Sequence, residues 1–192
     1  MVKLQKSIEK RAALLKATLC LINHEGIQGA SMAKVAKMAK ASPATIYLYF
    51  ENKQDMVNQL YLEVKTAFAE KTFEEYKAEA PVKKNFERIW FNMSQFKLNQ
   101  PEEASFLSQC DNTPMIDEQT QQEGLKYLQP LFDLWKQGQE EEIIKPISPY
   151  LLYAFTIYPM AFLMNMQKRD AYQVDKKALE EAFQAAWDSI KV

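Results

Sequence analysis

Two helix-start signals follow each other closely near the N-terminus, and together they constrain the fold more than any other feature. Ser31 precedes a short apolar repeat that ends at Ala39, and serine is a favoured N-cap residue. Ser42 precedes Pro43, and proline is tolerated in the first turn of a helix because the N–H it lacks has no partner there. The spacing therefore predicts two short helices separated by residues 40–42.

A longer helix is predicted on each side of this pair. Before it, apolar residues recur at steps of three and four over Ser7–Asn23, namely Ile8, Ala12, Leu15, Leu19 and Ile22. Gly26 and Gly29 are expected to end this helix. After the pair, Asn52 is the predicted N-cap of a helix from Lys53 to about Lys77. A long helix followed by two short ones has helix-turn-helix spacing, in which the second short helix enters the major groove of DNA.

The distribution of charge agrees with a polyanionic partner. Residues 1–53 hold nine Lys and Arg against three acids, a net charge of +6, whereas the remaining residues hold 15 bases against 22 acids, a net of −7. A basic segment on an acidic body is typical of a protein whose one end meets nucleic acid. A basic face that is merely solvated is the alternative.

The second short helix has the side chains that a groove-binding helix needs. Ala44 and Thr45 are small enough to approach base edges, and the Thr45 methyl group can meet a thymine methyl group. Ile46 and Phe50 are four residues apart, so they are predicted to face inward and hold the helix to its neighbours.

Two tyrosines and a lysine supply polar groups around this helix. Tyr47 and Tyr49 can reach phosphate oxygens, although core packing is the alternative for each, since buried tyrosine is common. Lys53, in the first turn of the next helix, would add its charge to N–H groups that already suit a phosphate.

Residues 31–53, "SMAKVAKMAKASPATIYLYFENK", resemble the DNA-binding motif of the TetR family of bacterial repressors. The matching features are the Val35-Ala36 pair, the aromatic ending at Tyr47, Tyr49 and Phe50, and the Lys53 that follows. The close resemblance covers residues from about 8 to 62. The rest of the chain agrees in length, in helical content and in the character of its last two helices.

The resemblance implies a set of DNA-contacting residues. It implies phosphate contacts for Ser31, Ser42, Tyr47 and Lys53. It places Pro43, Ala44 and Thr45 nearest the bases. With Lys40 added, the full set is Ser31, Lys40, Ser42, Pro43, Ala44, Thr45, Tyr47, Tyr49 and Lys53.

Two positions depart from the family pattern. Lys40 stands where glycine is usual, so either a left-handed backbone there costs about 1–2 kcal/mol or the turn is reshaped and aims Lys40 at DNA. Leu48 stands where a polar or aromatic contact is common.

The body is also predicted to be helical. Helices are expected from about Val82 to Asn99, from Pro101 to near Cys110, from Asp117 to about Gln137 with a kink at Pro130, and from Asp175 to Lys191. The apolar stretch Leu151–Met166 is shorter than the roughly 20 residues of a membrane span and contains Pro159, so it is predicted to be a helix buried on all sides.

These elements give an all-α fold of about nine helices in two domains. Residues 1–53 form a three-helix helix-turn-helix DNA-binding domain, and residues 54–192 form a helical ligand-binding and dimerisation domain. Aromatic and Met side chains of the middle helices can line an adaptable apolar pocket or an ordinary core, and family members respond to small molecules there. The candidate ligand-binding residues are Trp90, Met93, Phe106, Tyr127, Trp135 and Tyr158.

The last two helices are more apolar than the outer layer of a monomer requires. In the TetR family they pair with their copies in a four-helix dimer interface, and paired reading heads need paired half-sites. The residues assigned to dimerisation are Tyr158, Phe162, Leu179, Phe183, Trp187 and Ile190.

The function expected is a cytoplasmic, homodimeric transcriptional regulator, most simply a repressor released from a palindromic double-stranded operator by a small apolar inducer. The alternative is a DNA-binding regulator of the same fold that has no small-molecule site and is controlled by a protein partner; a tightly filled core would favour it.

Other classes are set aside. An enzyme is not expected, because no cluster of titratable residues is evident. No cofactor or metal is expected either, since His24 and two distant Cys cannot form a zinc site. No membrane partner or signal peptide is expected, because the N-terminus has no apolar core. A thiol sensor is a further alternative, with Cys110, close to a loop, more exposed than Cys20.

Overall fold

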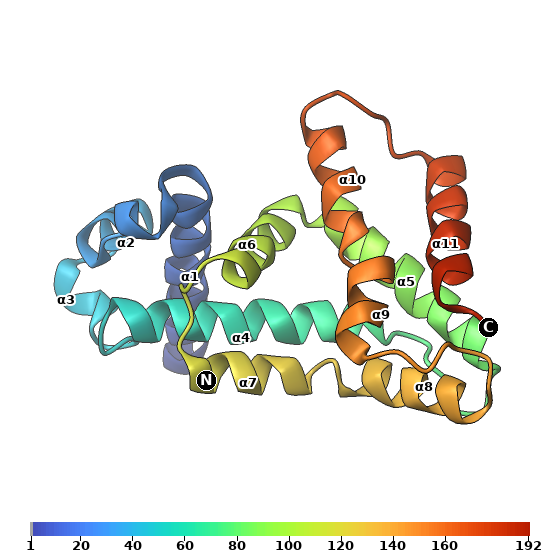
Figure 1. Ribbon diagram of the computed structural model, residues 1–192. Helices are drawn as coiled ribbons and strands as arrows, with labels where there is room; N and C mark the ends of the chain where they lie inside the picture. Colours follow the sequence, from blue (N-terminus) through green and yellow to red (C-terminus); the bar gives the residue numbers. More distant parts are fainter. Residues whose placement is uncertain (1) are drawn as a thin grey trace. The chain divides into compact units, whose positions relative to one another are not determined.

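The computed structural model describes residues 2–192, with side chains from Leu4 onward. These residues form eleven helices and one isolated antiparallel bridge, between Ile144 and Lys191 (Figure 1). The helices are α1 (Val2–Gly29), α2 (Met32–Met38), α3 (Pro43–Ile46), α4 (Lys53–Thr72), α5 (Val82–Asn99), α6 (Pro101–Asn112), α7 (Glu118–Lys126), α8 (Gln129–Glu140), α9 (Pro149–Thr156), α10 (Pro159–Lys168) and α11 (Lys176–Ile190). The all-α prediction is confirmed.

The helices cluster into two compact units that interleave along the chain. Unit 1 comprises the chain up to Thr66 together with Pro101–Gly124, and unit 2 comprises Ala67–Gln100 together with Leu125–Val192. Helix α6 therefore belongs to the unit that contains α1, α2 and α3. The predicted boundary after residue 53 separates a DNA-binding domain from a ligand-binding and dimerisation domain. This division by function stays a prediction.

Side-chain caps start the helices where the sequence indicates them. Ser31 and Ser42 each accept a hydrogen bond from a backbone N–H three residues later. Asn52 Oδ1 accepts from the N–H of Asp55 at 3.0 Å, and Asp55 Oδ2 accepts from the N–H of Glu51 at 2.9 Å. This reciprocal pair satisfies donors at the start of α4 that have no partner inside the helix.

Helix α1 is longer than predicted. It begins at Val2 instead of Ser7 and reaches Gly29, with a break at Gly26, where φ is +71°. A positive φ favours glycine, so the predicted stop at Gly26 appears as a kink. Leu15, Leu19 and Ile22 are buried as expected, whereas Ile8 and Ala12 are exposed.

Prolines divide two of the predicted helices. Pro130 lies in the first turn of α8 and separates it from α7, and Pro159 lies in the first turn of α10 and separates it from α9. A proline ring clashes with the preceding helical turn and lacks an N–H. These two breaks raise the number of helices from about nine to eleven.

The prediction that Leu151–Met166 is buried on all sides is wrong. Leu152, Ile157 and Met160 are buried, but Leu151, Phe155, Tyr158 and Phe162 are exposed. No helix among the described residues is long and apolar enough to span a membrane.

An aromatic core fills unit 2. Phe86 of α5 lies 6.1 Å from Phe183 and 6.0 Å from Trp187 between ring centroids, both on α11. Trp90 lies 5.7 Å from Phe183, and its indole N–H donates to the carbonyl oxygen of Thr156 at 2.9 Å. Helices α5, α9 and α11 are thus held together by one cluster of rings.

The two cysteines differ from the expectation of a thiol sensor. Cys110 is buried on α6, and Cys20 is the more accessible of the two. Burial, with a further contribution from Asp111, raises the pKa of the Cys110 thiol to about 12. A thiol with so high a pKa is a poor nucleophile near neutral pH. The order of exposure predicted for the two cysteines is therefore wrong.

Candidate nucleic-acid interface

The turn between α2 and α3 ends α2 with a Schellman motif. The N–H of Ala41 donates to the carbonyl oxygen of Ala36 at 2.8 Å, and the N–H of Lys40 donates to that of Lys37 at 3.2 Å. Lys40 has φ of +51°, the left-handed conformation that this motif normally gives to glycine. Of the two alternatives for Lys40, the structure has the strained backbone.

Replacing Lys40 with Gly should therefore raise the free energy of unfolding by about 1 kcal/mol, because glycine adopts a positive φ without steric cost. Urea denaturation followed by circular dichroism measures the change. Lys37→Gly is the matched control, since the same substitution inside α2 should lower stability by about 1 kcal/mol. A loss of stability in both variants would show that the turn does not strain Lys40.

Helix α3 presents its first turn to solvent. The Ser42 hydroxyl accepts from the Thr45 N–H at 3.1 Å and lies 2.8 Å from the Thr45 hydroxyl. Ser42, Pro43 and Ala44 are exposed, and Thr45 is half-buried. The turn predicted to lie nearest the bases is thus open to solvent at Ser42, Pro43 and Ala44 and partly covered at Thr45.

The opposite side of α3 holds it to the rest of unit 1. Ile46 and Phe50 are 0% and 1% exposed, which confirms the prediction that they face inward. Leu48 is 80% exposed, so it stands on the open side of the motif beside Tyr47.

The two tyrosines have different environments. Tyr47 is 60% exposed. Tyr49 is half-buried, and its hydroxyl accepts a hydrogen bond from Ser7 Oγ of α1 at 3.2 Å. Tyr47 is therefore available to a phosphate without rearrangement, whereas Tyr49 joins α1 to the end of the helix-turn-helix.

Ser31 and Lys53 lie at helix starts, as predicted. The Ser31 hydroxyl accepts from the Lys34 N–H at 3.3 Å, and Ser31 is exposed. Lys53 is the first residue of α4 and is half-buried. Both positions combine a polar side chain with helix N–H groups, an arrangement that suits phosphate oxygens.

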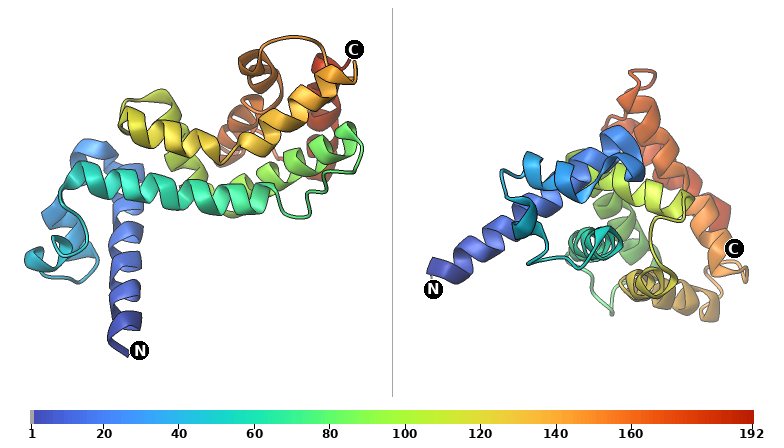
Figure 2. Two further views of the ribbon diagram at one scale, coloured as in Figure 1. Left: turned by 90° about the horizontal axis from the view of Figure 1, so that it is seen from below. Right: turned by 90° about the vertical axis from the view of Figure 1, so that its left-hand side faces the viewer.

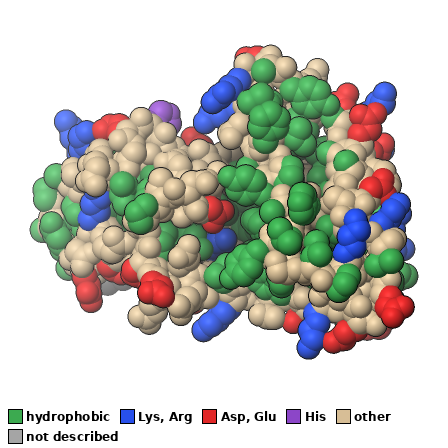
Figure 3. Space-filling model, viewed as in Figure 1, with side chains coloured by type: hydrophobic (Ala, Val, Ile, Leu, Met, Phe, Trp, Pro, Cys, Tyr) green, Lys and Arg blue, Asp and Glu red, His purple; other side chains and the backbone are tan. Residues whose placement is uncertain are grey.

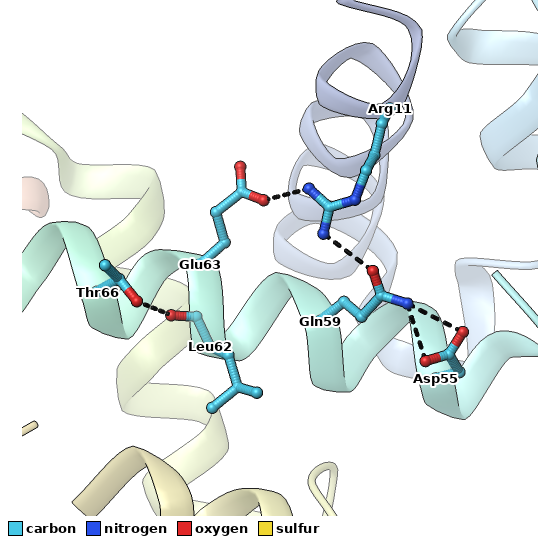
Figure 4. A network of polar contacts seen from close by, with 6 residues as sticks. All are labelled: Arg11, Asp55, Gln59, Leu62, Glu63 and Thr66. Atoms are coloured by element: carbon cyan, nitrogen blue, oxygen red, sulfur yellow. Dashed lines mark hydrogen bonds and ion pairs between the residues drawn. The ribbon is translucent and has the colours of Figure 1, made fainter. Parts of the chain in front are cut away.

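A polar network fixes α1 to α4 (Figure 4). The Arg11 guanidinium donates to Glu63 Oε2 at 2.6 Å and to Gln59 Oε1 at 2.9 Å, and the Gln59 amide donates in turn to Asp55. The same guanidinium lies 5.9 Å from the centroid of the Phe50 ring. The sequence gives no sign of this role for Arg11 beyond a basic residue within an amphipathic helix.

The six candidate ligand-binding residues do not surround one described cavity. Trp90, Met93 and Trp135 of unit 2 and Phe106 of unit 1 are at most 1% exposed, while Tyr127 is half-buried and Tyr158 is exposed. The indole N–H of Trp135 has no hydrogen-bond partner among the described residues. A groove of about 480 Å³ in unit 2 is lined by other residues, mainly of α5 and α11, including Phe91, Leu98 and Leu179.

The candidate dimerisation residues fall into two groups. Leu179, Phe183, Trp187 and Ile190 are at most 5% exposed and form part of the core of unit 2, because the apolar stripe of α11 packs on α5 and α9. Tyr158 and Phe162 are exposed. They belong to an apolar patch over α9 and α10 that is visible in Figure 3, formed by Tyr150, Leu151, Phe155, Tyr158 and Phe162.

Known proteins match both parts of the chain. Residues 14–60 match the bacterial regulatory proteins of the tetR family, and residues 81–191 match the tetracyclin repressor-like C-terminal domain. An uncharacterised HTH-type transcriptional regulator from Haemophilus influenzae is 27% identical over 93% of this chain and 94% of its own length. The fatty acid metabolism regulator protein of Bacillus subtilis is 34% identical over 74 residues, 38% of each chain.

A solved structure has the same fold. The TetR family transcription regulator from Marinobacter aquaeolei superposes with a TM-score of 0.91 at 24% identity, over 100% of this chain and 99% of that one. An N-terminal helix-turn-helix on an all-helical chain, matched by family models of bacterial regulators, is that of a DNA-binding transcriptional regulator. The chain belongs to the TetR family, and it is a regulator, not an enzyme.

Proposed function

We propose that the protein is a homodimeric repressor that binds a palindromic operator and is released by a small apolar molecule. The observation that supports DNA binding is the solvent-exposed first turn of α3, next to the exposed side chain of Tyr47. Ile46 and Phe50 are buried and hold this helix in place. Side chains at such a turn read base edges, while hydroxyls and lysines around it hold phosphates.

The apolar patch over α9 and α10 supports the dimer. Single exposed apolar residues are ordinary, but a contiguous patch of large side chains on a protein surface marks an interaction site. A two-fold pair of reading helices matches an operator with two half-sites in successive turns of the major groove.

Helix α4 is the element proposed to carry the response. Its residues up to Thr66 belong to unit 1, and its last turns belong to unit 2. The Arg11 network ties its first half to α1, so a shift of α4 would carry the helix-turn-helix with it. A ligand that prefers the shifted state would lower operator affinity in proportion to that preference.

A regulator of the same fold without a small-molecule site is the second candidate. It is favoured by the burial of Trp90, Met93, Phe106 and Trp135, because side chains with almost no accessible surface border no water-sized space. In this candidate a protein partner controls DNA binding.

One experiment separates these proposals. Duplexes are selected from a random DNA pool by the purified protein, and their affinity is measured by fluorescence anisotropy against scrambled DNA. Sequence-dependent binding in units of two chains is expected. Long-chain acyl compounds are the first inducer probes, because one relative regulates fatty acid metabolism by name. Release of DNA by such a probe supports the repressor; intact binding across an apolar panel supports the second candidate. Binding no tighter than to scrambled DNA contradicts both.

Lys53→Ala should weaken binding to the selected and the scrambled duplex alike. Each phosphate contact contributes about 0.9 to the slope of log affinity against log salt, so the loss of one contact per subunit should lower the slope of a dimer by about 1.8. Anisotropy titrations over a salt series measure this. Lys71→Ala, in the last turn of the same helix, is the matched control. Equal slopes for the two variants would remove Lys53 from the interface.

A further inference from the structure

The first turns of α1 project beyond the packed part of unit 1. Leu4 and Ile8 are 68% and 56% exposed, and the first buried residue of the helix is Leu14. Both views in Figure 2 show this end of α1 extending away from α4. Most helices in proteins are stabilised by packing of an apolar face, and this segment has little such packing. Its exposed surface is therefore available to bind a partner.

A basic face of this segment adjoins the helix-turn-helix. Lys6, Ser7 and Lys10 are three or four residues apart or adjacent, so they lie on one side of the helix. Ser7 donates its hydrogen bond to the Tyr49 hydroxyl at 3.2 Å, and Arg11, one turn later, lies over the Phe50 ring. The two lysines therefore lie next to the contacts that α1 makes with Tyr49 and Phe50, at the end of the helix-turn-helix.

The charges of these lysines are not neutralised within the described chain. Lys6 is exposed and Lys10 half-buried, and neither forms an ion pair with a residue between 4 and 192. The first turn of α1 also contains no acid. A bound polyanion would neutralise these two positive charges, and such phosphate contacts supply binding affinity through the release of counterions.

We propose that the projecting turns of α1 form an arm in which Lys6 and Lys10 bind the sugar-phosphate backbone of DNA outside the bases read by α3. The inference rests on the proposed DNA-binding function and adds a second contact region to it. The arm supplies affinity without sequence information, since phosphate contacts position a protein on the duplex and base contacts specify the site.

The test uses the full-length protein and the double variant Lys6→Ala/Lys10→Ala. The probes are a duplex selected by the wild type, trimmed to the protected bases, and the same duplex extended by about one helical turn of ten base pairs at each end. We expect the variant to lose about 0.9 in salt slope for each phosphate contact removed. The loss should be larger on the extended duplex, with the preference among sequences unchanged.

Two further variants keep the outcome clear. Lys16→Ala makes the same change on an exposed position of α1 beyond the arm, and Lys6→Arg/Lys10→Arg keeps both charges and should bind as the wild type does. The proposed arm would be wrong if the double alanine variant and Lys16→Ala had equal salt slopes on both duplexes. If the wild type prefers no sequence, the proposed function fails, and the slopes on the scrambled duplex still decide whether the arm binds phosphates.

Discussion

Phe162→Glu should convert the protein to a monomer and lower operator affinity by about 10²–10⁴-fold, the usual gain from linking two binding modules. Phe162 is 62% exposed within the subunit and lies in the apolar patch with Tyr158 and Phe155. A carboxylate at the centre of an apolar interface would be buried without a partner, which is strongly unfavourable. Light scattering after gel filtration gives the mass, and anisotropy gives the affinity.

The fold of the subunit should survive this change, because the side chain replaced is mainly in solvent. The melting temperature of the isolated variant subunit should therefore stay within the range of surface substitutions. Leu125→Glu is the control, since Leu125 is an exposed aliphatic residue on α7, outside the patch. A Phe162→Glu protein that remains a dimer would place the interface elsewhere.

The helix-turn-helix could be predicted from the sequence because its signals are local. Ser31 and Ser42 indicate helix starts because each side chain accepts a hydrogen bond from the N–H three residues later. Pro43 indicates one because a proline lacks the N–H that has no partner in the first turn. The pair Ile46 and Phe50 faces inward by helical spacing alone. Lys40 marks the limit of local signals, because the sequence left both a left-handed backbone and a reshaped turn open, and the structure has the left-handed one.

Which surface an apolar stripe covers could not be predicted, because periodicity does not distinguish a neighbour in the same chain from a second subunit. The apolar stripe of α11 is the pattern expected of a dimer interface, and within the subunit Phe183 and Trp187 of this stripe pack against Phe86. The α9–α10 segment was expected to be buried and instead exposes Phe155 and Phe162. Contacts between residues far apart in the sequence, such as the ion pair of Arg11 with Glu63, cannot be predicted from helical periodicity.

Trp187 stabilises the subunit through its place in that aromatic core. Trp187→Ala should lower the free energy of unfolding by about 3–5 kcal/mol, as is typical when a large buried aromatic is truncated. This is a large fraction of the roughly 5–15 kcal/mol that stabilises an ordinary protein. Trp187 is 4% exposed and lies 6.0 Å from Phe86, with the Lys83 ammonium 5.8 Å from its ring.

Urea denaturation of Trp187→Ala beside Tyr172→Ala, an exposed aromatic, measures the loss. In thermal denaturation, the first variant should melt on the order of 10 °C lower than the wild type, and the second should melt at almost the same temperature. Because Trp187 lies in the core of its own subunit, the variant should lose stability in the monomer as well, which is tested by making the same change in Phe162→Glu. If Trp187→Ala instead produced stable, folded monomers, α11 would form the dimer interface and the apolar patch would need another partner.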